Sequence, residues 1–318
     1  MQRLDTSDIQ NAGSFLSREL EQRLPGVYSK KYANLWAEEG QYIPVGGTVE
    51  EGATSVVEEI MEEVGLAAEM TDLADDVPIV SVSVAEGKFN IHTFILGYTY
   101  SVLQLKAMAK SGRNLNVRKV IATDRGLRQK VHETLVFGDL KRGSKGFFNN
   151  PNVPTASSSY DPNTSSFQDD IDFVAKYMEA TESRNILQER TAFILVPNKL
   201  KYTWIKKFNT QGTQNVMQNI LESFGTANGG SLRGIYSVNE CNAQLLEQFG
   251  VKTAGTDEDR VVFIPESSDV VERLASAPSY MPPQLVGLNY KVCAYVSTSE
   301  TIVHYPDAMS YVDIAKGA

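Results

Sequence analysis

The clearest pattern of apolar and polar residues lies between residues 77 and 100. Three valines alternate with two serines from Val80 to Val84, and this period of two is typical of a β-strand with one buried face. The alternation changes phase around Gly87, which predicts a bulge or a tight turn there. About 14 residues of strand would reach roughly 45 Å, nearly the diameter of about 50 Å expected for a compact body of this length. The pattern allows two structures: a two-stranded arm that extends past its own body, or strands that fold back into a central sheet.

A long basic helix is predicted after this region. Residues 101–112 form a short helical stretch, and a second helical pattern runs from Asn116, a good N-cap, to about Phe137, where Gly138 can end it. Its roughly 22 residues would make a rod of about 33 Å. We interpret its apolar stripe as facing the core, and its basic residues as a solvated face or a surface for nucleic acid. The stripe consists of Val117, Val120, Ile121, Leu127, Val131 and Leu135.

The first part of the chain has mixed character. Residues 14–24 predict a short amphipathic helix that Pro25 and Gly26 end. Residues 27–45 are rich in aromatic residues without a clear period, which indicates an extended arm that has to rest on another surface. Residues 54–65, TSVVEEIMEEVG, fit a helix and a strand equally.

The rest of the chain is predicted to be mixed α/β. A polar, turn-rich loop at residues 156–166 marks a domain boundary. A helix capped by Ser166 follows it, and a later helix ends at Gly225. Short buried strands are expected at residues 191–197 and 260–265, and residues 266–318 have the pattern of strands.

Charge is divided between two neighbouring segments. The whole chain carries a net charge of −9, which argues against a simple nucleic-acid-binding protein. Residues 51–100 contain ten acidic residues and one lysine, whereas residues 101–150 contain eleven lysines and arginines and three acids. These segments are either two solvated faces or two surfaces that meet, within one chain or between copies.

No segment carries a motif of known catalytic or cofactor chemistry. The sequence has no phosphate loop, dinucleotide-binding glycine motif, nucleophile elbow or HExxH motif. We interpret the glycine-rich residues 225–234 as a loop, residues 72–76 (DLADD) as a solvated turn, residues 256–260 (TDEDR) as an exposed loop, and His132 as a structural histidine. Two cysteines make no disulfide framework, which indicates a reducing compartment. With neither a signal peptide pattern nor a membrane-spanning apolar run, the chain is expected to be a soluble, intracellular assembly protein without cofactor or metal.

Four stretches, in this order, resemble the major capsid proteins of tailed bacteriophages with the Hong Kong 97-type fold. They are SFLSRELEQRLPGVYSKKY, then LADDVPIVSVSV with FILGYTYSVLQL, then GFFNNPNV, and finally SAPSYMPPQLVGLNYKVCAYVSTSETIVHYPDAMSYVDI. The resemblance implies an α+β fold with five parts. These are an N-terminal arm (1–46), an extended β-hairpin or E-loop (47–98), a peripheral domain with a long spine helix (99–166), an axial domain (167–265), and C-terminal strands that return to the peripheral and axial core (266–318).

The resemblance also gives the segment KGFFNNPNV, residues 145–153, a role. It would turn the chain off the spine helix toward the axial domain. Phe147 and Phe148 are expected to be buried, and the asparagines and Pro151 to hold the turn.

The implied function is a non-enzymatic capsid protein that self-assembles into hexamers and pentamers of an icosahedral shell around a double-stranded DNA genome. The implied partners are identical copies, a scaffolding protein, a portal, decoration proteins and DNA held by non-specific contacts. A separate scaffolding protein is expected because the chain begins almost directly at the arm. The implied location is the virion, after assembly in the bacterial host cytoplasm. Three alternatives stay open: an encapsulin-like nanocompartment shell, an α/β enzyme with an unrecognised site, and a nucleic-acid-binding module, which the acidity disfavours.

Charge complementarity predicts how copies meet. In this family the E-loop lies across the neighbouring subunit, so an acidic hairpin is expected to contact basic residues of the next copy. Exposed pairs of this kind contribute about 0–1 kcal/mol each, and apolar burial at ~25 cal/mol per Å² would supply most of the stability. The acidic set is Glu58, Glu59, Glu62, Glu63, Asp72, Asp75 and Asp76, and the basic set is Lys106, Lys110, Arg113, Arg118 and Lys119.

Overall fold

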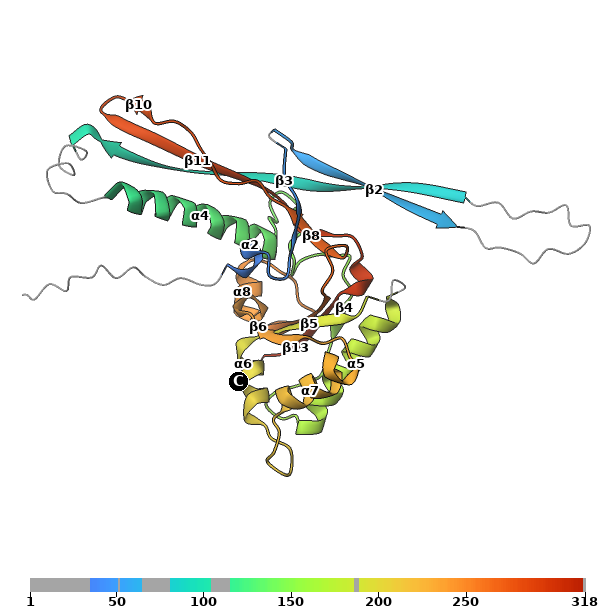
Figure 1. The fold of residues 1–318 in the computed structure, drawn as a ribbon. Helices are drawn as coiled ribbons and strands as arrows, with labels where there is room; N and C mark the ends of the chain where they lie inside the picture. Colours follow the sequence, from blue (N-terminus) through green and yellow to red (C-terminus); the bar gives the residue numbers. More distant parts are fainter. Residues whose placement is uncertain (1–34, 51, 65–80, 104–114, 186–188, 317–318) are drawn as a thin grey trace, which may run out of the picture. The chain divides into compact units, whose positions relative to one another are not determined.

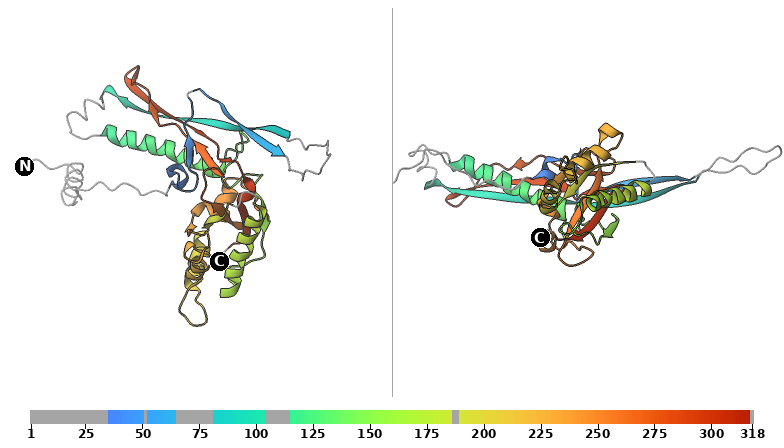
Figure 2. Two further views of the ribbon diagram at one scale, coloured as in Figure 1. Left: turned by 45° about the vertical axis from the view of Figure 1, so that its right-hand side comes forward. Right: turned by 90° about the horizontal axis from the view of Figure 1, so that it is seen from below.

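The computed structural model describes residues 35–50, 52–64, 81–103, 115–185 and 189–316, and Figures 1 and 2 show their arrangement. These residues form an α+β fold with two five-stranded sheets and one three-stranded sheet. The helix predicted at residues 14–24, the DLADD turn and most of the helix predicted at residues 101–112 lie outside the described residues. Among the described residues, no helix is both long and apolar enough to cross a membrane.

One five-stranded sheet has the order β4-β13-β7-β5-β6. β7 pairs antiparallel with β5 and β13, while β4 and β6 pair in parallel at the two edges. Along β7, Val261 and Phe263 face one core and Val262 and Ile264 face the other. Burial on both faces explains the nearly continuous apolar sequence of the predicted strands at residues 191–197 and 260–265. The strands are β4 (Thr155–Ser157), β5 (Thr191–Val196), β6 (Gly234–Ser237), β7 (Glu258–Pro265) and β13 (Ser310–Ala315).

Three helices cover one face of this sheet: α5 (Phe167–Arg184), α6 (Asn198–Lys206) and α7 (Val216–Phe224). The Ser166 hydroxyl accepts the Asp169 N–H at 3.2 Å, and the Asp169 carboxylate accepts the Ser166 N–H at 2.8 Å. This capping box confirms the predicted start of α5, and the end of α7 at Gly225 is also as predicted. A short 3-10 turn, Thr226–Asn228, follows α7.

The core on the other face of the sheet includes residues of α2 (Trp36–Glu39), α4 (Leu115–Phe137) and the chain after α8 (Ala243–Gln248). Trp36 and Ile43 are buried in this core. The arm expected to be extended over residues 27–45 therefore contains a helical turn in its described part. A four-residue helix is too short to produce a recognisable period in the sequence.

β3 (Ser81–Ser101) is one strand with two successive partners. Its residues 81–90 pair antiparallel with β2 (Ser55–Val64), and its residues 91–101 pair antiparallel with β11 (Asn289–Ser299). Residues 81–90 thus belong to a two-stranded arm and residues 91–101 to a sheet of the body, so each of the two structures allowed by the sequence applies to one half of the strand. Residues 55–64, which fitted a helix and a strand equally, form a strand. The ladder passes through Gly87 without a register shift, so the predicted bulge is wrong. A strand can change its buried face where its packing partners change, without any backbone irregularity.

α4 packs along β3 and β11. Its end is as predicted: Gly138 has a φ of 74°, and its N–H donates to the Thr134 carbonyl at 2.9 Å. The predicted N-cap at Asn116 is wrong, because the helix already includes Leu115. Leu127, Val131 and Leu135 of the predicted stripe are buried, whereas Ile121, at the edge of the stripe, is exposed.

The remaining strands come mostly from the C-terminal residues, as predicted. β1 (Val45–Gly47), β8 (Val271–Leu274) and β12 (Ile302–Val303) form the three-stranded sheet. β9 (Ser279–Tyr280) and β10 (Gln284–Val286) pair with β11. Two more 3-10 turns, Asn239–Cys241 and Pro306–Ala308, precede α8 and β13.

Candidate inter-subunit site

The partners of β3 change at Asn90 and Ile91. The Ile91 N–H donates to the carbonyl of Thr54, just before β2, at 3.1 Å. The Asn90 N–H instead donates to the Glu300 carboxylate at 3.1 Å, and the Glu300 N–H donates to the Asn90 carbonyl at 3.0 Å. The Glu300 side chain therefore ends the β3–β11 ladder at the base of the β2–β3 hairpin.

Glu300 also holds the chain that follows α4. Its Oε2 accepts from the Ser144 hydroxyl and from the Lys145 N–H, both at 2.7 Å. His92 of β3 places its Nε2 2.5 Å from the same hydroxyl. Glu300, Ser144 and His92 are each 2% exposed, so water cannot replace these bonds. We call Asn90, His92, Ser144, Lys145 and Glu300 the hairpin root.

Burial disfavours the protonated form of the histidine in the hairpin root. Burial lowers the pKa of His92 below its ordinary value of 6.5, and the charge of Arg142 lowers it further. Within the described residues, its buried Nδ1 has no hydrogen-bond partner. The charge of Glu300 acts in the opposite direction and raises the pKa of His92, but burial has the larger effect.

His304 attaches the hairpin at a second point. Its Nδ1 lies 2.5 Å from Oε1 of Glu58 in β2, and its Nε2 lies 3.4 Å from Oε1 of Glu272 in β8. These side chains line a cavity of about 490 Å³ together with Glu189 and Asp269. One imidazole thus bridges the hairpin and the three-stranded sheet.

The KGFFNNPNV segment is fixed against the core. Phe147 and Phe148 are fully buried, as predicted, and their N–H groups donate to carbonyls near the end of α4 at 2.8 and 2.9 Å. A Cβ on Gly146 would lie 2.2 Å from the backbone at the end of α4, so only glycine fits there. The Asn150 side chain accepts the Asn152 N–H at 3.0 Å, which holds the turn.

A buried ion pair connects this segment to the central sheet. Arg260 donates to both carboxylate oxygens of Asp313, at 2.7 and 2.9 Å, and to the Phe148 carbonyl at 2.6 Å. The Arg260 and Asp313 side chains are almost completely buried. The expected exposed loop at residues 256–260 is wrong for residues 258–260, because they begin β7 and both Asp259 and Arg260 are buried.

Sequence reasoning missed this pair, although a signal was present. Arg260 directly precedes the apolar run VVFIP, and Asp313 lies inside the apolar run YVDI. A charged residue within a buried strand needs a partner of opposite charge. Arg260 and Asp313 lie in two such strands, so the sequence could have predicted an ion pair between them.

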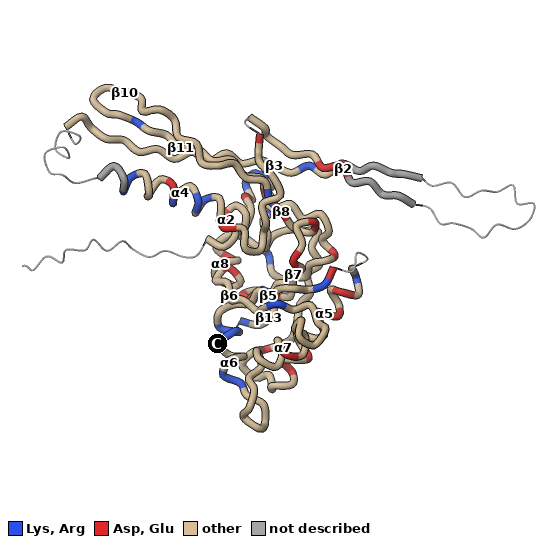
Figure 3. Tube along the Cα trace, viewed as in Figure 1, with Lys and Arg blue, Asp and Glu red and all other residues tan. Residues whose placement is uncertain are grey.

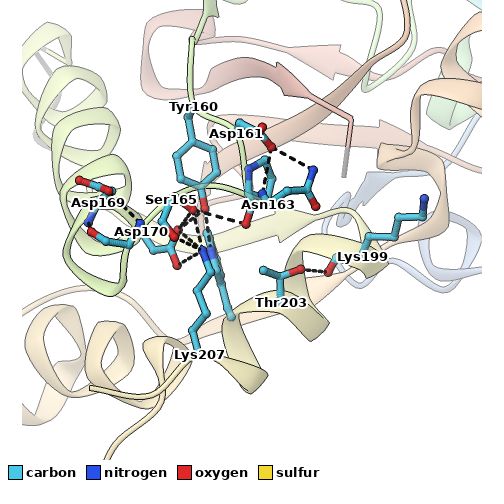
Figure 4. A network of polar contacts seen from close by, with 12 residues as sticks. Tyr160, Asp161, Asn163, Ser165, Asp169, Asp170, Lys199, Thr203 and Lys207 are labelled. Atoms are coloured by element: carbon cyan, nitrogen blue, oxygen red, sulfur yellow. Dashed lines mark hydrogen bonds and ion pairs between the residues drawn. The ribbon is translucent and has the colours of Figure 1, made fainter. Parts of the chain in front are cut away.

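A third polar cluster joins α5 and α6 (Figure 4). Asp170, fully buried in the first turn of α5, accepts from the Lys207 ammonium at 2.9 Å, the Ser165 hydroxyl at 2.6 Å and the Tyr160 hydroxyl at 2.5 Å. The Trp204 indole N–H of α6 donates to the Tyr160 oxygen at 3.0 Å. Burial raises the pKa of Tyr160, so its hydroxyl keeps the proton that it donates. The cluster fixes the end of α6 relative to the start of α5.

Two groups among the exposed large apolar side chains are suited to contacts with other molecules. Leu285, Val286 and Leu288 lie at the β10–β11 hairpin, where Figure 3 shows few charged residues. A second group, on α6 and just after it, comprises Tyr202, Ile205 and Phe208. Exposed apolar groups of this kind are typical of interaction surfaces.

The charged residues predicted to connect copies are only partly described. Glu58 and Lys119 are bonded within their own chain, Glu58 to His304 and Lys119 through its ammonium to the Thr99 carbonyl at 2.6 Å. Glu59 and Arg118 are exposed. Six residues and the side chains of two others lie outside the described part: Asp72, Asp75, Asp76, Lys106, Lys110, Arg113, and those of Glu62 and Glu63. The contact between copies stays a prediction.

The remaining titratable groups have structural surroundings. His132 is buried and lies 3.0 Å from the Glu240 carboxylate, as expected for a structural histidine. Burial alone would raise the pKa of Glu240, but hydrogen bonds from His132 and Trp36 lower it below its ordinary value. Within the described ranges, no three His, Cys, Asp or Glu side chains gather in a way that could hold a metal ion.

A long helix thus packs along a strand that two partners share, and polar clusters are buried in the surrounding scaffold. The capsid of the Myoviridae phage XM1 has this fold, with a TM-score of 0.74 and 15% identity over 95% of this chain and 98% of that chain. The structure from Gordonia phage Cozz has a TM-score of 0.60 and 13% identity over 99% of this chain and 98% of that chain. The capsid of an empty GTA particle has a TM-score of 0.59 and 11% identity over 98% and 100%.

The model of the major capsid protein family matches residues 65–314. The chain belongs to this family, and it is a capsid shell subunit with the α+β fold of Hong Kong 97-type phage capsid proteins. This is a family of structural proteins. No curated protein sequence matches the chain.

Proposed function

We propose that copies of this chain assemble as hexamers and pentamers into an icosahedral shell around the double-stranded DNA genome of a tailed bacteriophage. The observation that carries the proposal is the β2–β3 hairpin. Among the described strands, residues 81–90 of β3 pair with β2 alone. An isolated two-stranded ribbon is marginal in water, so this hairpin needs a neighbouring surface.

The base of the hairpin supports the same proposal. Glu300 and His304 attach the hairpin to the body at two separate points. A hairpin held at its base meets its partner with less loss of conformational freedom than a mobile one. Because rings of identical copies close through head-to-tail contacts, the neighbouring copy can supply the missing surface for every hairpin.

We assign the parts of the chain accordingly. Residues 1–46 are the N-terminal arm, 47–98 the E-loop, 99–166 the peripheral domain with α4 as the spine helix, 167–265 the axial domain, and 266–318 the returning strands. Residues 91–98 support the E-loop from within the body, since they pair with β11. The described part of the hairpin that reaches the neighbour is therefore β2 together with residues 81–90 of β3.

We further propose that the acidic hairpin contacts the basic segment of the next copy. Glu59 and Arg118 are the described members of the two sets whose side chains are exposed. Such pairs determine register more than affinity. Assembly should therefore weaken at high salt without being abolished.

Electron microscopy and light scattering of the purified protein test the proposed function. The expected result is rings and closed shells that form above a threshold concentration. The Glu59→Lys and Arg118→Glu variants should each assemble less well and should assemble better when combined, whereas Glu247→Lys, at an exposed position of α8, should assemble normally. A monomer at all concentrations, with the hairpin packed on its own body, would contradict the proposal.

The other partners follow from the same role. We propose a separate scaffolding protein, a portal, decoration proteins and non-specific contacts with packaged DNA, with assembly in the bacterial cytoplasm and a final location in the virion. Coexpression with the scaffolding protein should increase the yield of closed shells relative to open sheets and spirals. An unchanged ratio of closed to open assemblies would count against that partner.

A further inference from the structure

The outer side of α6 carries an exposed apolar surface. Tyr202 is 63% exposed, Ile205 is 37% exposed, and Phe208, just after the helix, is 53% exposed. Tyr202 and Ile205 are three residues apart and therefore lie on the same side of the helix. Leu200 and Trp204 occupy the opposite side and are buried against the sheet. We call Tyr202, Ile205 and Phe208 the α6 surface.

This surface is held rigidly. Lys207, directly after α6, donates to the buried Asp170 of α5 (Figure 4). The Trp204 indole donates to the Tyr160 hydroxyl. A surface whose supporting helix is fixed in this way loses little conformational entropy when a partner packs on it. The exposed rings of Tyr202 and Phe208 are therefore suited to a specific contact.

The helices α5 and α6 carry opposite charge. α6 contains three lysines and no acidic residue, whereas α5 contains five acidic residues and two basic ones. Two of the acids, Asp172 and Glu179, are exposed and seven residues apart, so they lie on one side of α5, and the exposed Lys176 lies between them. Figure 3 shows the basic residues on α6 and the acidic residues on α5.

The sheet places these two helices toward opposite edges. α6 contacts β6, which is one edge strand, while α5 contacts β5, β7 and β13, the last of which is next to the other edge strand β4. α7 contacts both helices and lies between them. Two complementary surfaces on opposite sides of one body are the requirement for a head-to-tail ring.

We propose that, in each ring of subunits, the α6 surface of one copy packs against the outer side of α5 in the next copy. The lysines beside the α6 surface, Lys201 and Lys206, face Asp172 and Glu179 of the neighbour. This inference rests on the proposed assembly of the chain into rings. It names the contact that closes each ring near its axis, separately from the contact made by the β2–β3 hairpin.

Nucleic acid is the competing ligand for a surface with lysines and aromatic rings. The second copy is favoured because the matching acidic surface belongs to the same chain, and because Ile205 contributes apolar area that neither stacks on a base nor binds phosphate. A DNA-binding measurement separates the two. If the variant Lys201→Glu with Lys206→Glu loses DNA binding but still forms rings normally, the proposal is overturned.

Charge reversal tests the contact. The variant Lys201→Glu with Lys206→Glu should reduce the yield of rings by about tenfold, because several exposed pairs of up to about 1 kcal/mol change from attraction to repulsion. The variant Asp172→Lys with Glu179→Lys should do the same. The fourfold variant should recover most of the yield, since the signs match again. Circular dichroism of the isolated subunits checks that all variants fold.

A cross-link gives a second, direct measurement. Oxidation of the Tyr202→Cys, Glu179→Cys double variant should produce a covalent ladder up to the full ring, and each single variant should not. If the wild-type protein forms no rings, the proposed function fails. If rings form but neither the charge variants nor the cross-link shows the expected effect, this contact fails and the proposed function stands.

Discussion

Replacing Glu300 by glutamine tests the hairpin root most directly. The carboxylate is 2% exposed and accepts hydrogen bonds from Asn90, Ser144 and Lys145. In Glu300→Gln an NH₂ group takes the place of one oxygen. If Oε1 keeps its bond to Asn90, the new NH₂ faces the Lys145 N–H, and the Ser144 hydroxyl has to turn to accept instead of donate.

The expected loss follows from these contacts. A buried N–H that loses its acceptor costs about 1–3 kcal/mol, and bonds to a charged acceptor contribute about 1.5–3 kcal/mol each. Burying a neutral amide is easier than burying a carboxylate, which offsets part of this loss. We expect Glu300→Gln to lower the free energy of unfolding by roughly 2–4 kcal/mol.

Urea unfolding of the unassembled subunit measures this difference, with an unchanged m-value as the sign that the denatured state is the same. Hydrogen exchange should show faster exchange of the Asn90 and Lys145 amides, since both depend on Glu300. The matched control is Glu266→Gln, whose side chain is 44% exposed and which should change stability by less than about 0.5 kcal/mol. Equal urea midpoints for Glu300→Gln and the wild type, with both amides still protected, would refute the role of Glu300 at the hairpin root.

Three further results are expected. Arg260→Met should destabilise the subunit by about 3–5 kcal/mol in urea because it leaves Asp313 charged and buried, and adding Asp313→Leu should restore part of the loss; no gain from the second substitution would contradict this. Because burial lowers the pKa of folded His92, the unfolded chain binds a proton that the folded chain does not, so stability should fall as the pH drops below 6.5; His92→Gln should flatten this dependence, and an unchanged slope would disprove it. Cys241 is fully buried and burial raises its pKa, whereas Cys293 is half-buried, so a thiol reagent should modify Cys293 first and Cys241 only after unfolding; rapid reaction of both thiols would be inconsistent with this core.

Local signals in the sequence predicted local structure well. Ser166 and Gly138 marked helix ends because each acts on backbone groups within a few residues. The apolar runs at residues 191–197 and 260–265 predicted buried strands. These segments form β5 and β7, in which nearly every residue is buried. The resemblance of four ordered stretches to phage capsid proteins indicated the family that the match over residues 65–314 shows.

The errors arose where distant residues decide the environment. A bulge or a tight turn was expected around Gly87, but this residue continues a regular ladder with β2 opposite it. Arg260 was placed in an exposed loop, although Asp313 makes its burial possible. The extended arm contains the helical turn at Trp36, whose ring is buried in a core made by later residues.

The sequence by itself determined several of the strands and helices and where some of them end. These properties depend on hydrogen bonds and side-chain periods within a few residues. Only the tertiary structure decided that β3 is shared between β2 and β11, and that Glu300 joins it to the chain after α4. The bonds responsible connect residues 210 and 155 positions apart, and no local pattern specifies which of many distant groups a buried carboxylate will meet.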